Sequence, residues 1–273
     1  NLVRHFELSR EGVSFKAERP EHEQSREFLA SKDPWFRPTM LKTGPDGGLY
    51  IADMYRLVIE HTEWIPDDVE QYMDPRAGTD KGRIYAVTKK GQMPQAVPRL
   101  ASLSASDLVV NLGHENGWQR DTAQRLLIES NASEQAPALK KLLRQTENPV
   151  ARLHDLWILR LLGQLSEDEL LFGISDLHPE VRRNALILSE SHQSPVMLGA
   201  RYFMQPLETA LEGLKDPSAA VRFQAILSTG SRLENWKVKA FLEAMHENAT
   251  DPIMRQALLT AIPEYLRPML THV

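Results

Sequence analysis

The sequence of 273 residues contains no cysteine. This absence excludes disulfides, thiolate metal ligands, cysteine nucleophiles and a C-x-x-C-H haem attachment. The sequence also lacks any run of 18 apolar residues and any signal-type leader, so we expect no membrane-spanning segment in it. Lysine and arginine form no cluster and the net charge is −5, which argues against a nucleic-acid partner.

The residues that are present divide into two halves of different character. The length predicts about two domains, and an apolar share of 42% is enough to fill their cores. Residues 1–90 read as β-structure, residues 91–98 as a proline-containing linker, and residues 99–273 as helices. The expected fold class is therefore a multidomain α+β protein.

The β half is centred on a hairpin. Thr39–Thr43 and Leu49–Asp53 are apolar or alternating runs of strand length, and the Gly-Pro-Asp-Gly-Gly sequence between them is a strong turn signal. A third run, Arg83–Val87, follows only after residues 54–81, although hairpin loops usually have about 2 to 5 residues. The apolar content of this long connection predicts that it is ordered and packed.

Two further strands are expected at Leu2–Leu8 and Val13–Ala17, with a turn at residues 9–12. One propeller blade uses four strands, so five strands make a blade and a fraction and cannot close a ring. The edges of such a small sheet are normally covered. We therefore expect that the missing blades precede Asn1 in a longer protein or come from another chain.

The motifs of this half together resemble a known family. GPDGGLYIAD and GRIYAV are similar to a blade of an NHL-type or sugar-dehydrogenase-type β-propeller. The fuller set, WFRP, TGPDGGLYIADMYR, IEH, EWIP, RAG and GRIY, resembles the last part of the propeller in the large "membrane-bound dehydrogenase" proteins of planctomycetes, which are similar to glucose and sorbosone dehydrogenases. The resemblance covers nearly all of residues 1–98.

The resemblance implies a partial propeller of about one blade followed by HEAT-like repeats. It also implies oxidation of sugars or alcohols, with pyrroloquinoline quinone and calcium as cofactors of the full-length protein. The implied location is periplasmic or membrane-associated. The sequence itself offers no metal site, because its acidic and histidine residues lack ligand spacing.

The candidate site residues lie at the end of the second hairpin strand and in the connection after it. An arginine beside aromatic rings can hold a carboxylate or a planar quinone, and a histidine can act as acid or base near neutral pH. We assign a catalytic role to His61 and a cofactor-binding role to Arg37, Asp53, Tyr55, Arg56, Glu60 and Arg83. A packing role stays open for each of them, for example an Arg56–Glu60 ion pair or Asp53 ending its strand.

The helical half repeats itself. The strings WQRDTAQRLL, VARLHDLWIL, EVRRNALILS, AVRFQAILST and PIMRQALLTA align at spacings of 32, 30, 40 and 32 residues, with Arg120, Arg152, Arg182, Arg222 and Met254 in one column. Such periods predict an α-α solenoid of about five HEAT-like helix pairs. The 40-residue interval predicts an insertion around residues 191–204.

Acidic residues in two of the predicted turns have a structural explanation. Asp176 and Asp216 each lie six residues before an arginine of the column. They can cap the following helix, while the arginine reaches toward a neighbouring turn.

Two functions remain open at this stage. The chain is either the C-terminal region of a quinoprotein-like dehydrogenase, inactive as isolated, or a non-catalytic module whose solenoid binds a protein partner on its concave face. A helical-repeat enzyme similar to the phycobilin lyases is a third reading, but the β half has no place in that family.

Overall fold

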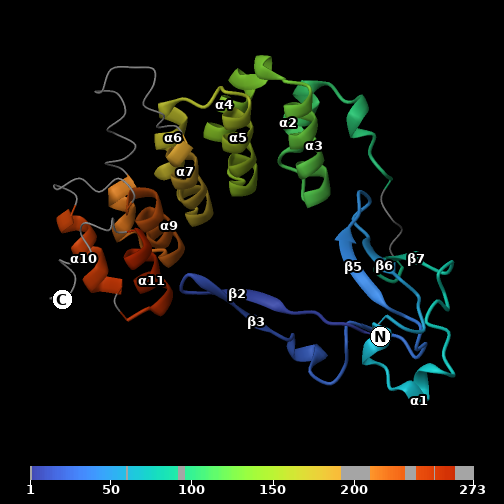
Figure 1. Cartoon of the computed structure of the whole chain (residues 1–273). Helices are drawn as coiled ribbons and strands as arrows, with labels where there is room; N and C mark the ends of the chain where they lie inside the picture. Colours follow the sequence, from blue (N-terminus) through green and yellow to red (C-terminus); the bar gives the residue numbers. More distant parts are fainter. Residues whose placement is uncertain are drawn as a thin grey trace. The chain divides into compact units, whose positions relative to one another are not determined.

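The computed structural model describes residues 2–59, 61–91, 96–191, 210–230, 238–248 and 250–261. The chain is an α+β protein with about 51% helix and small antiparallel sheets, and its described residues form no closed barrel (Figure 1). It divides into two compact units. Unit 1 comprises Asn1–Ser9, Lys16–Leu100 and Glu115–Gln119, and unit 2 comprises Arg10–Phe15, Ala101–His114 and Arg120–Val273.

The described residues include seven strands, which form three separate sheets. The main sheet has the order β5-β6-β7 and is antiparallel throughout, and the two smaller sheets pair β1 with β4 and β2 with β3. The strands are β1 (Leu2–Val3), β2 (Glu7–Glu11), β3 (Ser14–Glu18), β4 (Leu29–Ala30), β5 (Pro38–Thr43), β6 (Leu49–Asp53) and β7 (Arg83–Val87).

The main sheet agrees with the predicted hairpin and third run. Its tight turn is held by Asp46, whose Oδ1 accepts a hydrogen bond from the backbone N–H of Gly48 at 3.1 Å. The Tyr50 hydroxyl donates to Asp46 Oδ2 at 2.9 Å. The long connection between β6 and β7 contains a 3-10 turn, η2 (Thr62–Trp64), and a short helix, α1 (Asp67–Glu70).

The prediction of a single first strand at Leu2–Leu8 is wrong. The chain instead forms β1, leaves the strand, and begins β2 at Glu7. The turn lies at Gly12–Val13 and not at residues 9–12, because Gly12 takes a φ of +58°, a left-handed conformation that glycine adopts without steric cost.

The two faces of the main sheet differ in what covers them. The register places Leu41, Ile51 and Tyr85 in one row. Ile51 is fully buried there, and buried Phe36 lies 6.0 Å from the Tyr85 ring, measured between centroids. The centre of this inner face is therefore covered, whereas Leu41 and Tyr85 on either side of it are 41% and 39% exposed.

The opposite row crosses the sheet through Met40, Ala52 and Ile84, which we call the outer face. Met40 is 58% exposed and Ile84 is 72% exposed. An apolar row left in water on a sheet is unfavourable, and within the described part of the chain the outer face is the less covered of the two.

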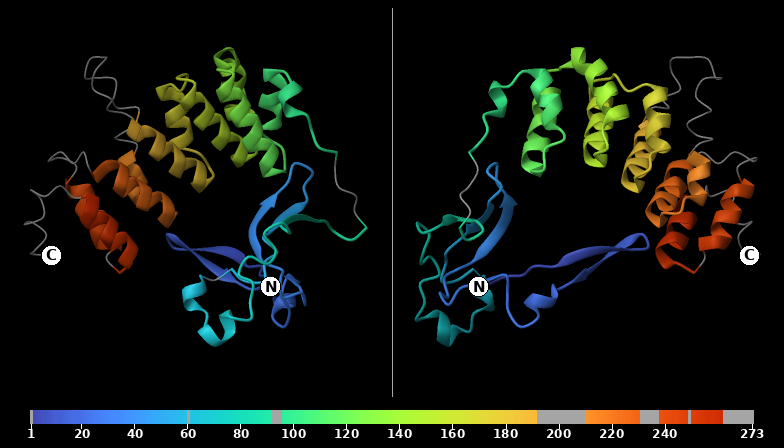
Figure 2. Two further views of the ribbon diagram at one scale, coloured as in Figure 1. Left: turned by 45° about the vertical axis from the view of Figure 1, so that its right-hand side comes forward. Right: turned by 180° about the vertical axis from the view of Figure 1, so that it is seen from behind.

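Unit 2 is built from helices joined by short turns. In Figure 1 and in both views of Figure 2 the helices follow one another in a curved row. The helical segments between residues 100 and 191 are η3 (Leu100–Ser102), α2 (Ala105–Asn111), α3 (Gly117–Glu129), η4 (Ser133–Gln135), α4 (Ala136–Gln145), α5 (Pro149–Leu161), α6 (Glu167–Ile174) and α7 (Pro179–Ser191). Beyond residue 209 they are η5 (Gly213–Lys215), α9 (Ala219–Gly230), α10 (Val238–Asn248) and α11 (Pro252–Ala261).

The helices begin where the sequence supplies capping groups. Ser104 caps α2, Asn148 caps α5 with proline at the first helical position, and Ser166 with Glu169 forms a capping box on α6. Helices α4 and α6 pack on α5 and α7, and α5, α7, α9 and α11 contact one another in succession. The buried leucines of these helices form the core.

The aligned arginine column needs one change. In α5, α7 and α9 the backbone N–H of the column arginine donates to the carbonyl oxygen of the residue immediately before the first residue of the helix. In α11 that position belongs to Arg255, whose N–H donates to Asp251 O at 2.9 Å, and not to Met254. The predicted insertion at residues 191–204 lies, except for Ser191, outside the described residues.

Candidate functional site

Four of the predicted site residues lie together where β6 ends. Asp53 is the last residue of β6 and is 2% exposed. Its Oδ1 accepts hydrogen bonds from the backbone N–H groups of Arg37, at 2.8 Å, and Tyr55, at 2.9 Å. Arg83 begins β7 and is the cross-strand neighbour of Asp53. The buried carboxylate of Asp53 thus fixes the backbone on both sides of it.

Tyr55 forms the centre of what we call the Tyr55 cluster, which consists of Asp33, Trp35, Asp53, Tyr55 and Arg83. The Arg83 guanidinium carbon lies 3.5 Å from the Tyr55 ring centroid, and the Trp35 ring lies 5.7 Å away. The Tyr55 hydroxyl donates to Asp33 Oδ2 at 2.7 Å. A cation over an aromatic face and a hydroxyl bonded to a carboxylate both stabilise the cluster.

The backbone at Tyr55 is in an unusual conformation. Its φ is +48°, in the left-handed region that only a few per cent of non-glycine residues occupy. Gly78, with a φ of +90°, packs against it so closely that a Cβ there would lie 2.5 Å from the Tyr55 carbonyl oxygen. A left-handed tyrosine persists only where its surroundings hold it in place.

The pKa values in the cluster do not favour proton transfer near neutral pH. The hydrogen bond from the Trp35 backbone N–H, followed by that from the Tyr55 hydroxyl, lowers the pKa of Asp33 below its usual range. The same bond to Asp33 raises the pKa of Tyr55. Asp33 therefore stays ionised and Tyr55 stays protonated around neutrality.

The remaining predicted residues lie apart from these interactions or beyond description. The His61 side chain is 73% exposed, and its Nδ1 accepts a hydrogen bond from the Glu63 backbone N–H at 3.3 Å. Arg56 is partly buried beside Gly78. Glu60 lies outside the described residues, so its predicted pairing with Arg56 stays a prediction.

The residues that are brought together do not fit a quinone cofactor as they stand. Arg83 stacks on Tyr55 and donates from Nε to Lys81 O at 3.2 Å, and Arg37 donates from Nη2 to Leu57 O at 3.2 Å. Both guanidinium groups that would hold a quinone are thus already engaged by groups of the chain itself. No group of three or more acidic or histidine residues suited to a metal ion occurs in the described part of the chain.

Sequence reasoning assigned no binding role to three participants of this region, which are Asp33, Trp35 and Gly78. Asp33 accepts from the Trp35 backbone N–H two residues later, and this local pattern is visible in the Asp-Pro-Trp sequence. Only the strand register and the left-handed turn bring Arg83 and Gly78 to Tyr55, and neither can be read from the sequence.

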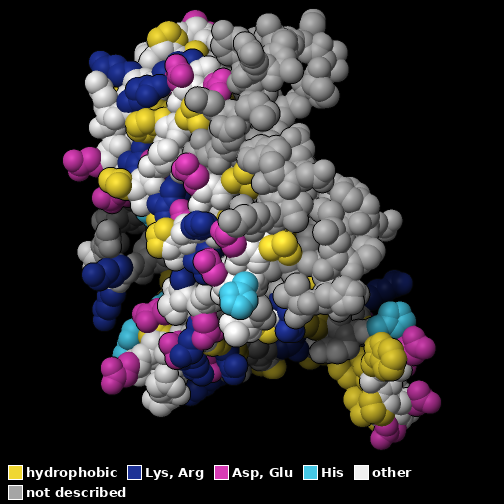
Figure 3. All heavy atoms as spheres, turned by 90° about the vertical axis from the view of Figure 1, so that its left-hand side faces the viewer, with side chains coloured by type: hydrophobic (Ala, Val, Ile, Leu, Met, Phe, Trp, Pro, Cys, Tyr) yellow, Lys and Arg dark blue, Asp and Glu magenta, His cyan; other side chains and the backbone are white. Residues whose placement is uncertain are grey.

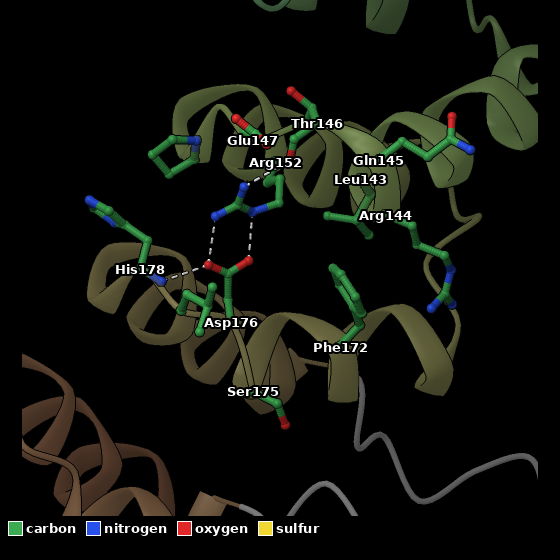
Figure 4. Close-up of a pocket in the computed structure, with 12 residues that line it drawn as sticks. Leu143, Arg144, Gln145, Thr146, Glu147, Arg152, Phe172, Ser175, Asp176 and His178 are labelled. Carbon is green, nitrogen blue, oxygen red and sulfur yellow. Dashed lines mark hydrogen bonds and ion pairs between the residues drawn. The ribbon is translucent and has the colours of Figure 1, made fainter.

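A cleft of about 820 Å³ lies in unit 2 between the α4–α5 turn and the α6–α7 turn. Figure 4 shows Leu143 and Phe172 facing each other across it, Arg144 at one side, and the paired Arg152 and Asp176 at the other. Its lining is Leu143, Arg144, Gln145, Thr146, Glu147, Pro149, Arg152, Phe172, Ser175, Asp176, Leu177 and His178.

The walls of this cleft are joined by an arginine that contacts both turns. Arg152 donates from Nη1 to Thr146 O at 2.9 Å in its own turn. It also donates from Nε and Nη2 to the two carboxylate oxygens of Asp176 in the next turn, at 2.6 and 2.8 Å. Asp176 Oδ1 in addition accepts from the His178 backbone N–H at 2.7 Å. We call this arrangement a turn bridge.

The turn bridge recurs one interval further along the chain. Arg182 donates to Asp176 O at 2.8 Å and to both carboxylate oxygens of Asp216, at 2.7 and 2.8 Å. Arg222 donates to Asp216 O at 2.8 Å and to Asn248 Oδ1 at 3.1 Å. The prediction that the arginines reach toward neighbouring turns is confirmed, and the turn acids serve mainly as their partners.

The molecular surface shows no concentration of one charge where it can be seen. On the face drawn in Figure 3 the described lysine and arginine side chains alternate with aspartate and glutamate side chains. Within the described ranges, none of the helices combines the length and the apolar character that crossing a membrane requires.

Comparison with known proteins gives one result. Residues 1–91 match the family model described as a domain of unknown function, DUF7133. No curated protein and no solved structure matches the chain. The family match covers the β half and stops before helix α2.

Proposed function

We propose that the chain is a non-catalytic interaction part of a sugar- or alcohol-dehydrogenase-like protein. In this proposal the main sheet belongs to a terminal propeller blade, and the helices form a HEAT-like solenoid that serves as a scaffold. The observation that carries it is the apolar outer face of the sheet, Met40–Ala52–Ile84, in a unit whose polar cluster is bonded within itself. Blades of a propeller are normally covered by their neighbours.

The contacts among the polar groups of unit 1 favour a structural role for the Tyr55 cluster over a catalytic one. Asp53 binds two backbone N–H groups, Tyr55 binds Asp33, and Arg83 lies on Tyr55. These interactions shape the long connection and leave His61 at the surface, more than two-thirds exposed and without a described contact to the cluster. A catalytic base normally has an orienting partner and a substrate within hydrogen-bond reach.

A charged substitution in the outer face tests whether this face binds another sheet. Isolated in solution, the chain should self-associate at high concentration through the exposed apolar row, and Ile84→Lys should suppress this association because a lysine cannot be buried against a second sheet. Thr39→Lys, at an exposed position on the other edge strand, β5, is the control. Sedimentation velocity with both variants decides the matter, and equal association of wild type and Ile84→Lys contradicts the proposal.

Catalysis is tested directly. The chain supplied with pyrroloquinoline quinone, calcium and glucose or ethanol should not reduce a redox dye, since Arg37 is bound to the Leu57 carbonyl oxygen and Arg83 to the Lys81 carbonyl oxygen and the Tyr55 ring. Dye reduction that depends on the quinone and is lost in His61→Ala would refute the non-catalytic assignment and restore His61 as the catalytic residue.

A further inference from the structure

The long connection between β6 and β7 contains a stretch of unusual composition, residues 63–74, which we call the acidic segment. We propose that it is the docking site for an arginine-rich segment of a partner protein, whose guanidinium groups pair with its carboxylates and lie on its exposed aromatic rings. This proposal rests on the interaction role proposed above, and it names a second surface of unit 1 and the chemistry of what binds there.

The two aromatic side chains of the acidic segment lie in water. Trp64 is 78% exposed and Tyr72 is 84% exposed, more than any other phenylalanine, tyrosine or tryptophan in the described part of the chain. Figures 1 and 2 show α1, which belongs to this segment, at the lower border of unit 1 in every view. Tryptophan and tyrosine are enriched in protein interfaces. Two such rings left in water therefore indicate a surface that a partner covers.

The charge of the acidic segment has one sign. Its charged residues are Glu63, Asp67, Asp68, Glu70 and Asp74, and it contains neither lysine nor arginine. The whole chain has 37 acidic and 32 basic residues. These five carboxylates therefore account for the entire net charge of −5, and the charges of the remaining residues balance.

The chain does not neutralise these carboxylates itself. Among the described residues, the one ionic partner of the five is His61, whose Nδ1 lies 3.8 Å from Glu63 and which pairs only when its imidazole is protonated. Asp74 accepts a hydrogen bond from the Arg76 backbone N–H at 2.9 Å, which fixes a turn but leaves the negative charge in place. A surface with uncompensated charge attracts a partner of the opposite charge and repels nucleic acid and anionic lipid.

The carboxylates and the aromatic rings select the same chemical group. A guanidinium pairs with a carboxylate through two parallel N–H···O bonds, and the face of a tryptophan or tyrosine attracts a cation within about 6 Å. The chain uses the second contact elsewhere, because Arg83 lies 3.5 Å from the Tyr55 ring centroid. Within the described residues Trp64 and Tyr72 have no such cation, so both faces are open to arginine side chains of a partner.

The backbone holds the two rings in place before a partner arrives. The Trp64 N–H donates to His61 O at 3.0 Å, and the Tyr72 N–H donates to Val69 O at 3.1 Å. The isoleucine or methionine that follows each ring in the sequence is half-buried, which anchors the segment on unit 1. A partner therefore does not have to order this surface, and such preorganisation raises affinity.

The test uses fluorescence anisotropy with the whole 273-residue chain and labelled peptides. The probe is RGRGRGR, and the comparison peptides are KGKGKGK and EGEGEGE. Salt at about 0.15 M screens charges that are more than about 8 Å apart. We expect saturable binding of RGRGRGR, weaker binding of KGKGKGK because lysine does not stack on aromatic rings as arginine does, and no binding of EGEGEGE.

Two variants separate the contribution of the rings from that of the carboxylates. Tyr72→Ser removes one exposed ring, and Asp67→Asn/Asp68→Asn removes two exposed charges. Each should weaken the binding of RGRGRGR about fivefold. The substituted side chains are all exposed, and circular dichroism verifies that the variants fold.

Each variant has a matched control outside the acidic segment. Phe6→Ser removes an aromatic side chain that is 44% exposed. Glu7→Gln/Glu11→Gln removes the same two charges from the exposed strand β2. Both controls should bind RGRGRGR as wild type does, because the proposed site is left intact.

Several outcomes overturn the proposal. They are no binding of RGRGRGR, equal binding of KGKGKGK or EGEGEGE, wild-type binding by either variant, and an equal loss in Glu7→Gln/Glu11→Gln, which would reduce the effect to net charge. Maltoheptaose that binds with a dependence on Tyr72 while RGRGRGR does not bind assigns the rings to a carbohydrate. None of these results bears on the outer face or on dye reduction, so failure here is distinguishable from failure of the proposed function.

Discussion

A buried acid in helix α5 gives the most quantitative prediction. Asp155 is 0% exposed, and neither of its carboxylate oxygens has a hydrogen-bond partner in the described part of the chain. Three residues after the column arginine, where α5 has Asp155, helices α3, α7 and α9 have fully buried alanines, Ala123, Ala185 and Ala225. Burial raises the pKa of Asp155 to about 8. The residue is therefore protonated in the folded protein at neutral pH.

The sign of the pH effect follows from the raised pKa. Below the unfolded pKa of 3.8 the folded and unfolded states are both protonated, so Asp155 costs nothing through ionisation. As the pH rises toward 8, the unfolded chain releases its proton and the folded chain does not, which removes about 1.4 kcal/mol of stability per pH unit. Between pH 5 and pH 8 the loss approaches about 4 kcal/mol.

Asp155→Ala should remove this loss. In urea unfolding followed by tryptophan fluorescence, to which Trp157 two residues away on the same helix contributes, the free energy of unfolding of the variant relative to wild type should rise by up to about 4 kcal/mol from pH 5 to pH 8. Asp155→Asn is the control. It should lose the same pH dependence, yet stay less stable than Asp155→Ala because its buried amide still lacks partners. A wild-type pH slope in both variants would refute the argument.

Two more substitutions test the described contacts. Gly78→Ala should destabilise unit 1 by about 2–3 kcal/mol in chemical denaturation, because the new Cβ adds a clash with the Tyr55 carbonyl oxygen to the strain of a positive φ. The control is Gly91→Ala, at a φ of +80° with nothing within 4 Å of the new Cβ, which should cost only about 1 kcal/mol. Equal costs for the two variants would contradict the clash. Asp216→Ala should lower the free energy of unfolding by about 3–5 kcal/mol, because it leaves the largely buried Arg182 guanidinium without its carboxylate. Asp216→Asn should cost less, since it keeps an oxygen to accept the Ser218 N–H in the turn. An unchanged midpoint of thermal unfolding in Asp216→Ala would show that the turn bridge contributes nothing to stability.

The sequence predicted the helical half well where the signal was periodic. The arginine column and the proline and asparagine caps fix where α5 and α7 begin, because such residues act within one turn of the chain. The last unit was placed one residue off, since Met254 matches the apolar pattern and only the backbone hydrogen bond of Arg255 shows the true position. The buried acid was not foreseen, because Asp155 looks polar and surface-bound in a linear string.

The β half was predictable in its strands and not in its site. Alternation and the Gly-Pro-Asp-Gly-Gly turn located β5 and β6, but the place of the turn between β2 and β3 depended on Gly12 taking a left-handed conformation. Proximity in sequence suggested that His61 would join Asp53 and Tyr55. The structure instead gathers residues far apart along the chain, such as Asp33 and Arg83, through register and one strained tyrosine.

The turn bridges have a mechanical consequence. Each column arginine from α5 to α9 connects its own turn to the following one, so successive turns are tethered along a single margin of the helical unit. A pull on the row cannot lengthen that margin without breaking charged hydrogen bonds, and the strain must be taken up where only apolar side chains slide past each other. We therefore expect the helical unit to be stiff along the margin that carries the turn bridges and to flex by separation of the helices at the opposite margin.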